Sequence, residues 1–286
     1  MPELPLVLGA APKDELALNP ELVEKVLVKF LRQELAARSF TRAVVALSGG
    51  VDSAVVAALA ARALGAEQVL GLRLPDHASQ ASSLTDAQSV AEWLGCQLET
   101  YPIGDMVRGY AEAPTIGPRR LGNVMARCRM IVLFDRGEAF GGLPLGTGNK
   151  TERLLGYYTW HDAGDAAPVN PLGDLFKTQV WDLARHLGVP STIIDKAPTA
   201  DLEPDQTDEG DLGIRYPRAD TILQHLILGR DPERLLRAGF QPSEVALVRS
   251  RLHKSHWKRG LPAVAMVSES AIGEAYLRPI DFRDLP

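Results

Sequence analysis

The residues at positions 48–53, Ser-Gly-Gly-Val-Asp-Ser, have the composition of an anion-binding loop. They follow the apolar run 43–47 and precede the alanine-rich stretch 53–64. A strand that leads through glycines into a helix gathers backbone N–H groups in front of the helix dipole, which suits phosphate above all. A simpler interpretation is a glycine turn in which Asp52 or Ser53 caps the helix. The complete string after a buried-type strand favours pyrophosphate, although the lysine of a Walker A loop is absent.

A second glycine turn lies at residues 146–152. It follows the short apolar run 143–145 and ends at Glu152, and the first turn likewise contains an acid, Asp52. Carboxyl ends of parallel strands meet at one edge of a sheet, so the two carboxylates could face one pocket. Two hard oxygen ligands beside a polyphosphate suit Mg²⁺. Each carboxylate alone is equally explained as a helix cap or a partner of the helix dipole.

Basic residues near these turns could neutralise a phosphate. Lys177 stands at the start of a predicted helix, where the helix dipole prefers acids, so it is either a solvated lysine or a charge kept for a ligand. Arg127 and Arg129 lie two residues apart on one predicted helix, so they cannot both face the core. One of the two is therefore expected to be structural, and the other to meet a phosphate or carboxylate.

The elements that must position these residues alternate between strand and helix. This alternation predicts an α/β fold with a doubly wound parallel sheet flanked by helices, an N-terminal helix and a C-terminal helical extension. Ligands of such folds bind beyond the carboxyl ends of the strands, where both glycine turns would lie. Apolar periodicity and capping residues predict strands at 43–47, 69–74, 97–103 and 143–145, and helices at 20–37, 53–64, 84–94, 121–140, 175–187, 221–228 and 243–252.

Composition and charge exclude several functions. A net charge of −5 argues against general binding to nucleic acid or anionic membranes. The longest apolar run, 55–61, is too short to span a membrane, and the amino terminus lacks the basic region of a signal peptide. Two cysteines fit a reducing cytoplasm and are too few for a disulfide framework. There is no Gly-x-Ser-x-Gly elbow and no His-Glu-x-x-His zinc pair.

The string at 48–53 resembles the pyrophosphate loop of the N-type ATP pyrophosphatases, a superfamily of ATP-dependent amidating and thiolating enzymes. Further strings resemble one branch of it, the NAD synthetases, over roughly 19–279 of the 286 residues. They include Leu-Gly-Thr-Gly-Asn-Lys-Thr-Glu at 145–152 and Pro-Thr-Ala-Asp-Leu at 198–202. The remaining strings are those at 122–130, 154–159, 170–179, 206–209 and 212–213.

This resemblance implies ATP-dependent amidation of deamido-NAD to NAD through an NAD-adenylate, with release of pyrophosphate and then AMP. It implies free ammonia as the nitrogen source, since no glutaminase unit is expected ahead of residue 48, while a separate glutaminase subunit stays an open alternative. It also implies a homodimer in the cytoplasm with deamido-NAD bound at the subunit interface. The whole chain, 1–286, would form one NAD synthetase domain with a loose lead-in at 1–18 and a tail at 253–286 that contributes to the substrate site. No nucleic-acid or membrane partner is expected.

The resemblance also implies roles for individual residues. Asp52 and Lys177 would be catalytic, and Mg²⁺ would be held by Asp52 and Glu152. ATP would be bound by Ala46, Leu47, Ser48, Gly49, Gly50, Val51, Asp52, Ser53, Arg73, Thr147, Lys177 and Thr199. The substrate would be bound by Arg127, Trp160, Asp165, Asp211, Trp257 and Lys258.

The chain departs from the family pattern at three places. Trp160 stands where a lysine is common, so that the substrate aspartate is either Asp162 or Asp165, and spacing favours Asp165. Trp257 stands where a histidine is common, and the loop 73–83 lacks the usual pattern that would give Gln80 an ATP role. Another adenylating or thiolating enzyme of the superfamily and a non-catalytic nucleotide sensor are the competing hypotheses.

Overall fold

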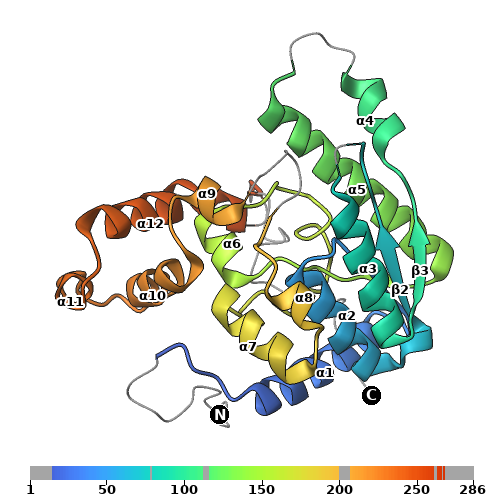
Figure 1. Ribbon diagram of the computed structural model, residues 1–286, viewed down its shortest axis with the longest axis horizontal. Coiled ribbons are helices and arrows are strands. Elements are labelled where there is room, and N and C mark those ends of the chain that lie inside the picture. The colour runs from blue at the N-terminus through green and yellow to red at the C-terminus, as the bar shows by residue number, and fades with distance from the viewer. Residues whose placement is uncertain are drawn as a thin grey trace.

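A four-stranded parallel sheet forms the centre of the computed structural model, which describes residues 15–77, 79–111, 116–199, 207–260, 263–265 and 267 (Figure 1). Its strands, in the order β3-β2-β1-β4, are β3 (Gln97–Thr100), β2 (Val69–Arg73), β1 (Ala43–Ala46) and β4 (Leu143–Pro144). Just beyond β4, Leu145 forms a parallel bridge with Val169. The predicted parallel α/β sheet is confirmed.

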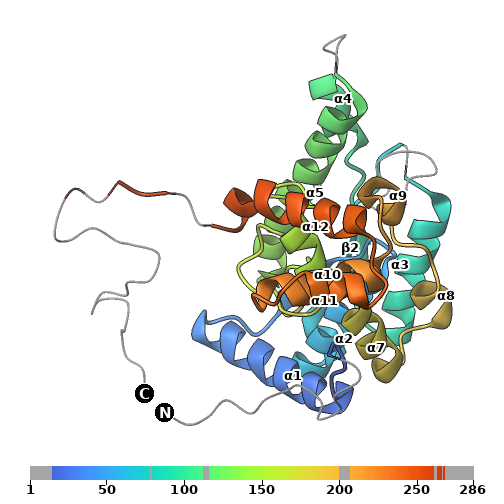
Figure 2. The same cartoon turned by 90° about the vertical axis from the view of Figure 1, so that its left-hand side faces the viewer.

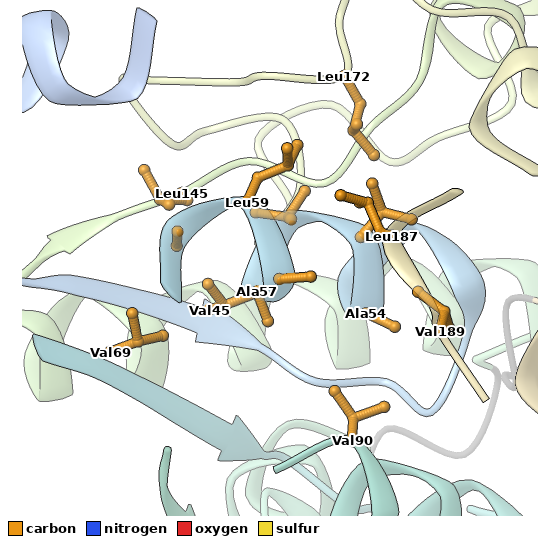
Figure 3. Packing of buried hydrophobic residues seen from close by; sticks show 14 of the residues in the cluster. Val45, Ala54, Ala57, Leu59, Val69, Val90, Leu145, Leu172, Leu187 and Val189 are labelled. Atoms are coloured by element: carbon orange, nitrogen blue, oxygen red, sulfur yellow. The ribbon is translucent and has the colours of Figure 1, made fainter. Parts of the chain in front are cut away.

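Helices cover both faces of this sheet. On one face, Val45 and Val69 pack with α1 (Pro20–Ala37), α2 (Val51–Leu64), α3 (Ala81–Leu94) and α7 (Lys177–Leu187) (Figure 3). On the other face, Val44, Leu70 and Leu72 pack with α4 (Gly104–Ala111) and α5 (Pro118–Phe140). Ten of the 14 residues of α2 are buried, because α2 lies between the sheet and other helices. This burial explains its alanines, whose small side chains allow close approach on every side.

A second group of helices extends from one side of the sheet (Figures 1 and 2). Its own apolar core joins α6 (Lys150–Leu155) and the start of α7 to the later helices, with Tyr216, Ile222 and Leu223 fully buried at its centre. The later members are α9 (Asp208–Leu212), α10 (Tyr216–Ile227), α11 (Glu233–Arg237), α12 (Pro242–Lys254) and the 3₁₀ turn η2 (His256–Arg259). The remaining short elements are η1 (Ala66–Gln68), which leads into β2, and α8 (Ser191–Ile194), which follows α7.

Most predicted elements are confirmed within a few residues, and the differences have local causes. The helix α5 begins at Pro118, earlier than expected, since proline suits the first turn. The helix α7 begins at Lys177, later than expected, because Gln179 accepts a hydrogen bond from the Phe176 N–H and fixes the helix start there. The short helices α4, α8, α9 and α11 were not predicted, since helices of one or two turns show little periodicity.

None of the helices in the described ranges is long and apolar enough to cross a membrane.

Candidate active site

A cavity of ≈ 980 Å³ opens beyond the carboxyl ends of β1 and β4, as the sheet topology predicts. Its walls come from both parts of the molecule, with the sheet supplying the two glycine turns and the helical group supplying α6, α9 and η2. The cavity is lined by all of residues 46–53 and by these further predicted site residues: Arg127, Thr147, Glu152, Trp160, Asp165, Lys177, Thr199, Asp211, Trp257 and Lys258.

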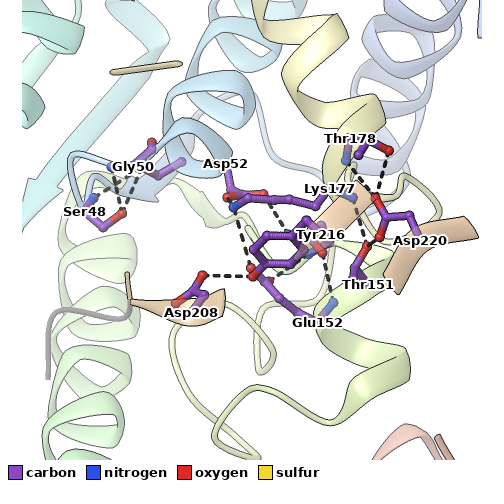
Figure 4. A network of polar contacts seen from close by, with 12 residues as sticks. Ser48, Gly50, Asp52, Thr151, Glu152, Lys177, Thr178, Asp208, Tyr216 and Asp220 are labelled. Atoms are coloured by element: carbon purple, nitrogen blue, oxygen red, sulfur yellow. Dashed lines mark hydrogen bonds and ion pairs between the residues drawn. The ribbon is translucent and has the colours of Figure 1, made fainter. Parts of the chain in front are cut away.

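The first glycine turn leaves its helix N-terminus facing the cavity without a side-chain cap. The N-cap of α2 is Gly50, so the alternative in which Asp52 or Ser53 caps the helix is wrong. Ser53 Oγ donates instead to the Gly50 carbonyl at 3.0 Å and accepts from the Ser48 N–H at 3.3 Å (Figure 4). Gly49 has φ +78°, and a Cβ there would lie 2.5 Å from the Ser83 carbonyl oxygen. Glycine is therefore required, and the N–H groups at the start of α2 remain for an anion.

The second glycine turn closes on itself. Asn149, fully buried, is the N-cap of α6, and its Oδ1 accepts from the Glu152 N–H at 3.0 Å. Glu152 Oε2 accepts in return from the Asn149 N–H at 3.1 Å, which completes a capping box. The remaining Asn149 group, Nδ2, donates to Asp52 Oδ1 at 2.9 Å. The cap of the second turn thus also orients the acid of the first.

Lys177 lies between the two carboxylates predicted to hold a metal. Its side chain is only 3% exposed, and its Nζ forms an ion pair with Asp52 and lies 4.0 Å from Glu152 Oε1 (Figure 4). Burial would lower the pKa of Lys177, but Asp52, Glu152 and Asp208 together raise it. The lysine therefore stays charged, and its ion pair explains why a cation is tolerated at a helix start.

This cluster contains three acidic side chains and one ammonium group within the described residues. Burial and the nearby Asp52 raise the pKa of Glu152 to about 8, and burial raises the pKa of Asp208. Asp208 Oδ1 is buried without a hydrogen-bond partner, while Tyr216 Oη donates to its other oxygen at 2.9 Å. Three carboxyl groups thus face one ammonium group in the described part of the chain, and a cation that displaces the Glu152 proton would be held by the negative charge left behind.

A fourth acid, Asp220, fixes the helices that carry Glu152 and Lys177. Asp220 on α10 is fully buried and accepts from Thr151 Oγ1 at 2.6 Å and from the N–H and Oγ1 of Thr178 at 3.0 and 2.8 Å (Figure 4). Thr151 Oγ1 in turn accepts from the Lys177 N–H at 2.9 Å. Burial raises the pKa of Asp220. This network fixes α6 against α7, and so fixes Glu152 relative to Lys177.

A tight loop at residues 159–165 also lines the cavity, next to the second glycine turn, since a Cβ added at Gly164 would lie 3.2 Å from Thr147 Oγ1. Both carboxylate oxygens of Asp162 accept hydrogen bonds from backbone N–H groups. These are the N–H of Thr159 at 3.1 Å and those of Gly164 and Asp165, each at 2.8 Å. Burial raises the pKa of Asp162 to about 6. Asp165 also lines the cavity, accepts from the His161 N–H at 3.2 Å and lies 4.0 Å from Arg153. Asp162 therefore shapes the loop through three backbone N–H groups, whereas Asp165 accepts one backbone N–H and also lies near Arg153.

Two residues considered for ATP binding, Arg73 and Gln80, do not line the cavity, whereas the two arginines of α5 do. Arg73 does not line the cavity, since its guanidinium donates to Thr100 Oγ1 at 2.9 Å and reaches the Leu84 carbonyl at 3.4 Å. Gln80 also lies outside the lining residues. Arg127 and Arg129 both line the cavity, and they donate to the carbonyls of Trp160 and Leu74, each at 3.2 Å.

Sequence reasoning missed several residues of the cavity. Asn149 carried a signal, because an asparagine three residues before a glutamate is a capping box pattern. Asp208 stood within a quoted family string, but nothing local indicated its burial. Lys196, which donates to Asp86 Oδ2 at 2.7 Å and Ser83 Oγ at 3.3 Å beside the first turn, had no sequence signal. No group of three or more His, Cys, Asp or Glu within the described ranges forms a complete metal cage.

Known proteins share this sequence pattern and fold. A family model described as NAD synthase matches residues 23–262. The NH(3)-dependent NAD(+) synthetase of Chlorobaculum parvum is 45% identical over 272 residues, 94% of this chain and 95% of that protein. The enzyme of the same name from Fusobacterium nucleatum is 42% identical over 260 residues, 89% of this chain and 99% of that protein.

Solved structures agree with these matches. An NMN synthetase from Francisella tularensis superposes with a TM-score of 0.77 at 29% identity, covering 87% of this chain and 99% of that chain. An NH3-dependent NAD synthetase from Campylobacter jejuni superposes with a TM-score of 0.75 at 29% identity, covering 87% and 100%. With a family model spanning most of its length and relatives above 40% identity, this chain belongs to the NAD synthase family.

Proposed function

We propose that this chain converts deamido-NAD to NAD with free ammonia at the expense of ATP. The observation that carries the proposal is the uncapped N-terminus of α2, which shares one cavity with the buried cluster of Asp52, Glu152 and Lys177. The nicotinate carboxylate attacks the α-phosphorus of ATP, the bond to pyrophosphate breaks, and an NAD-adenylate forms. Ammonia then attacks the acyl carbon, and AMP leaves.

The protein supplies no nucleophile in this reaction, so its work is placement and charge neutralisation. Backbone N–H groups of residues 50–53 would hold the departing pyrophosphate at the α2 N-terminus. Lys177 is charged and lies on the cavity wall, where it would neutralise the negative charge that develops on the phosphates. Thr147 and Thr199 also line the cavity and would donate hydrogen bonds to the same ligand.

A magnesium ion fits the residues present. The excess of carboxylates over ammonium groups around Lys177, and the orphaned Asp208 oxygen, are the observations that support it. Asp52 and Glu152 would hold the ion, with ATP oxygens and water completing the shell, as Mg²⁺ prefers. When bound it would lower the charge barrier to the attack of one anion on another.

The substrate residues would act from the other end of the cavity. Arg127 lies beside the Trp160 carbonyl, where its guanidinium suits a phosphate or carboxylate, and Asp165 and Asp211 suit hydroxyl groups. Lys258 already donates from Nζ to the carbonyls of Gly156 and Tyr158, at 2.9 and 2.7 Å. Lys258 therefore positions η2 as well as lining the site.

The test is incubation with ATP, Mg²⁺, deamido-NAD and ammonium, followed by measurement of NAD, AMP and pyrophosphate in equal amounts. ATP binding without any NAD would favour the sensor hypothesis. Because the Francisella relative is an NMN synthetase, nicotinic acid mononucleotide should be assayed in parallel. A higher kcat/KM for the mononucleotide would make amidation of that substrate the main activity.

The proposal includes a homodimer, one NAD synthetase domain and a cytoplasmic location. The helix α5 leaves Ile131 and Phe134 51% and 38% exposed, and their spacing puts them on one helix face that could contact a second copy. Both cysteines are free thiols, as a reducing compartment would keep them. Light scattering tests the dimer, and Ile131→Glu should then yield monomers.

A further inference from the structure

Two tryptophans that depart from the family pattern meet at the wall of the cavity. Trp160 comes from the 159–165 loop and Trp257 from η2, and both line the cavity. Their ring centroids lie 5.4 Å apart with the planes at 78°, so the two indoles form an open corner. His161 stacks on Trp160 at 4.1 Å. Trp257 nevertheless remains 59% exposed, so much of its ring is accessible to a ligand.

The corner is held by contacts on both sides before any ligand binds. On one side, Asp162 ties the loop by its three backbone hydrogen bonds, and His161 takes the left-handed φ of +61° that turns the chain there. On the other side, Tyr158 Oη donates to the Lys258 carbonyl at 2.9 Å, and Lys258 Nζ donates back to the Tyr158 carbonyl. A left-handed non-glycine residue persists only where its surroundings fix it, so this geometry is preorganised.

The charge of the side chain at position 160 decides which kind of ring would bind. A lysine at position 160 would repel a cationic ring, whereas the face of an indole attracts one. The N-ribosylated pyridinium of deamido-NAD is such a ring. Its carboxylate loses its negative charge when the acyl-adenylate forms, so the ring becomes more electron-poor as the reaction proceeds. Attraction to indole then strengthens along the reaction path, and interactions of that kind raise kcat.

We propose that Trp160 and Trp257 form an aromatic subsite for the pyridinium ring of the substrate, in place of the charged and polar contacts usual at these positions. The inference rests on the proposed function and deepens it. It predicts that the protein recognises the pyridinium ring by stacking, and that Trp160 and Trp257 act together in binding it.

Tryptophan fluorescence gives a direct test. The chain has four tryptophans, and the other two, Trp93 on α3 and Trp181 on α7, lie outside the cavity lining. The double variant Trp93→Phe/Trp181→Phe therefore reports on the corner alone. Trp181 Nε1 is buried without a partner, so its replacement removes no hydrogen bond.

Deamido-NAD and ADP-ribose are the matched probes, because they differ by the nicotinate ring. Excited indole transfers an electron to a stacked pyridinium, so deamido-NAD should quench the double variant strongly at saturation, while ADP-ribose should not. Equal quenching by both ligands would overturn the proposal, since adenine or phosphate would then cause it. Absence of quenching by deamido-NAD at concentrations that support turnover would overturn it too, while NAD formation would leave the proposed function standing.

Kinetics give a second test, which distinguishes an aromatic subsite from a purely structural role of Trp160. Trp160→Leu should raise KM for deamido-NAD about tenfold and leave KM for ATP unchanged. Trp160→Phe keeps a ring and should recover most of that loss. Trp93→Leu is the control for loss of a tryptophan outside the cavity and should change neither constant. If Trp160→Phe and Trp160→Leu behave alike, or KM for ATP rises equally, the aromatic subsite is refuted.

Discussion

The turn between β1 and α2 and the turn between β4 and α6 both lead from a parallel strand through glycines into a helix. In the first, no side chain caps the helix, and Ser48 and Ser53 only close the loop on itself. In the second, the Asn149 side chain accepts from the Glu152 N–H, and the Glu152 side chain accepts from the Asn149 N–H. Similar local sequences therefore give opposite surfaces, an anion acceptor in one turn and a source of carboxylate in the other.

The difference arises from one residue type at the N-cap. Glycine at position 50 has no side chain to satisfy the first N–H groups of α2, so a ligand must do so. At the start of α6, the Asn149 side chain instead accepts from the Glu152 N–H, and its amide N–H group still donates to Asp52. The two turns are coupled through that hydrogen bond and through Lys177, which lies between Asp52 and Glu152. Substitutions in either turn test the coupling.

The largest effect is expected from Asp52→Ala. This change removes a proposed metal ligand and the partner of both Lys177 and Asn149, so adenylation should fall about a thousandfold. Pyrophosphate release in the presence of deamido-NAD measures it. Asp52→Asn keeps the shape and should be nearly as inactive if charge is what matters, and unchanged turnover in Asp52→Ala would remove Asp52 from the mechanism.

Magnesium affinity should depend on pH through the second turn. The pKa of Glu152 is raised to about 8, so in the metal-free protein the carboxyl holds a proton that the ion must displace. Affinity should therefore rise about tenfold per pH unit from pH 6 toward 8, and titration calorimetry measures it. Without metal the native state binds more protons than the unfolded state between about pH 4.5 and 8, so its stability should fall as pH rises through that window.

Glu152→Gln is the control for this pH dependence. It should remove both slopes because no proton is left to titrate, while the amide oxygen of glutamine can replace Oε2 as the acceptor of the Asn149 N–H. A slope that persists in this variant would assign the titration to another group, such as Asp208.

A matched pair of glycine substitutions separates the two turns by their backbone. Gly49→Ala places a Cβ 2.5 Å from the Ser83 carbonyl at a left-handed φ, and should cost about 2 kcal/mol of stability together with ATP affinity. Gly148→Ala meets its nearest atoms at 3.8 Å and should change stability by less than about 0.5 kcal/mol. Thermal unfolding and ATP titration measure both, and equal effects would contradict the distinction between open and closed turns.

The smallest effect is expected from Asn149→Ala, which removes the α6 cap and should cost about 1 kcal/mol. Asn149→Ser keeps a capping oxygen but cannot reach Asp52, so it should recover stability without recovering kcat. Comparison of the melting temperature with kcat in the two variants isolates the hydrogen bond between the turns. Full recovery of kcat in Asn149→Ser would show that this bond does not orient Asp52.

Local patterns account for what could be predicted. The strand–glycine–helix signal at 48–53 and the apolar run before 146–152 depend on neighbours in the chain, and both turns lie where those patterns predicted. The sheet order then had to place them at one edge, because parallel strands share the direction of their carboxyl ends. Lys177 was noticed because it breaks a local rule, a cation at a helix start.

The misplaced expectations depended on long-range contacts. Arg73 is the last residue of β2, at the expected sheet edge, yet its guanidinium donates to Thr100 on the neighbouring strand, a partner that no local pattern identifies. The short helices around Asp208 were not predicted because their stability comes from packing on Tyr216 and α10, rather than from periodicity.

The sequence by itself therefore determined the two glycine turns, the acids within them and the family. Only the tertiary structure decided how the charges pair, that Asp162 builds a loop at the cavity wall, and that Trp160 and Trp257 meet. The physical reason is range. Helix starts and turns are satisfied by hydrogen bonds between residues a few positions apart, whereas burial and charge pairing depend on which distant segments the folded core brings together.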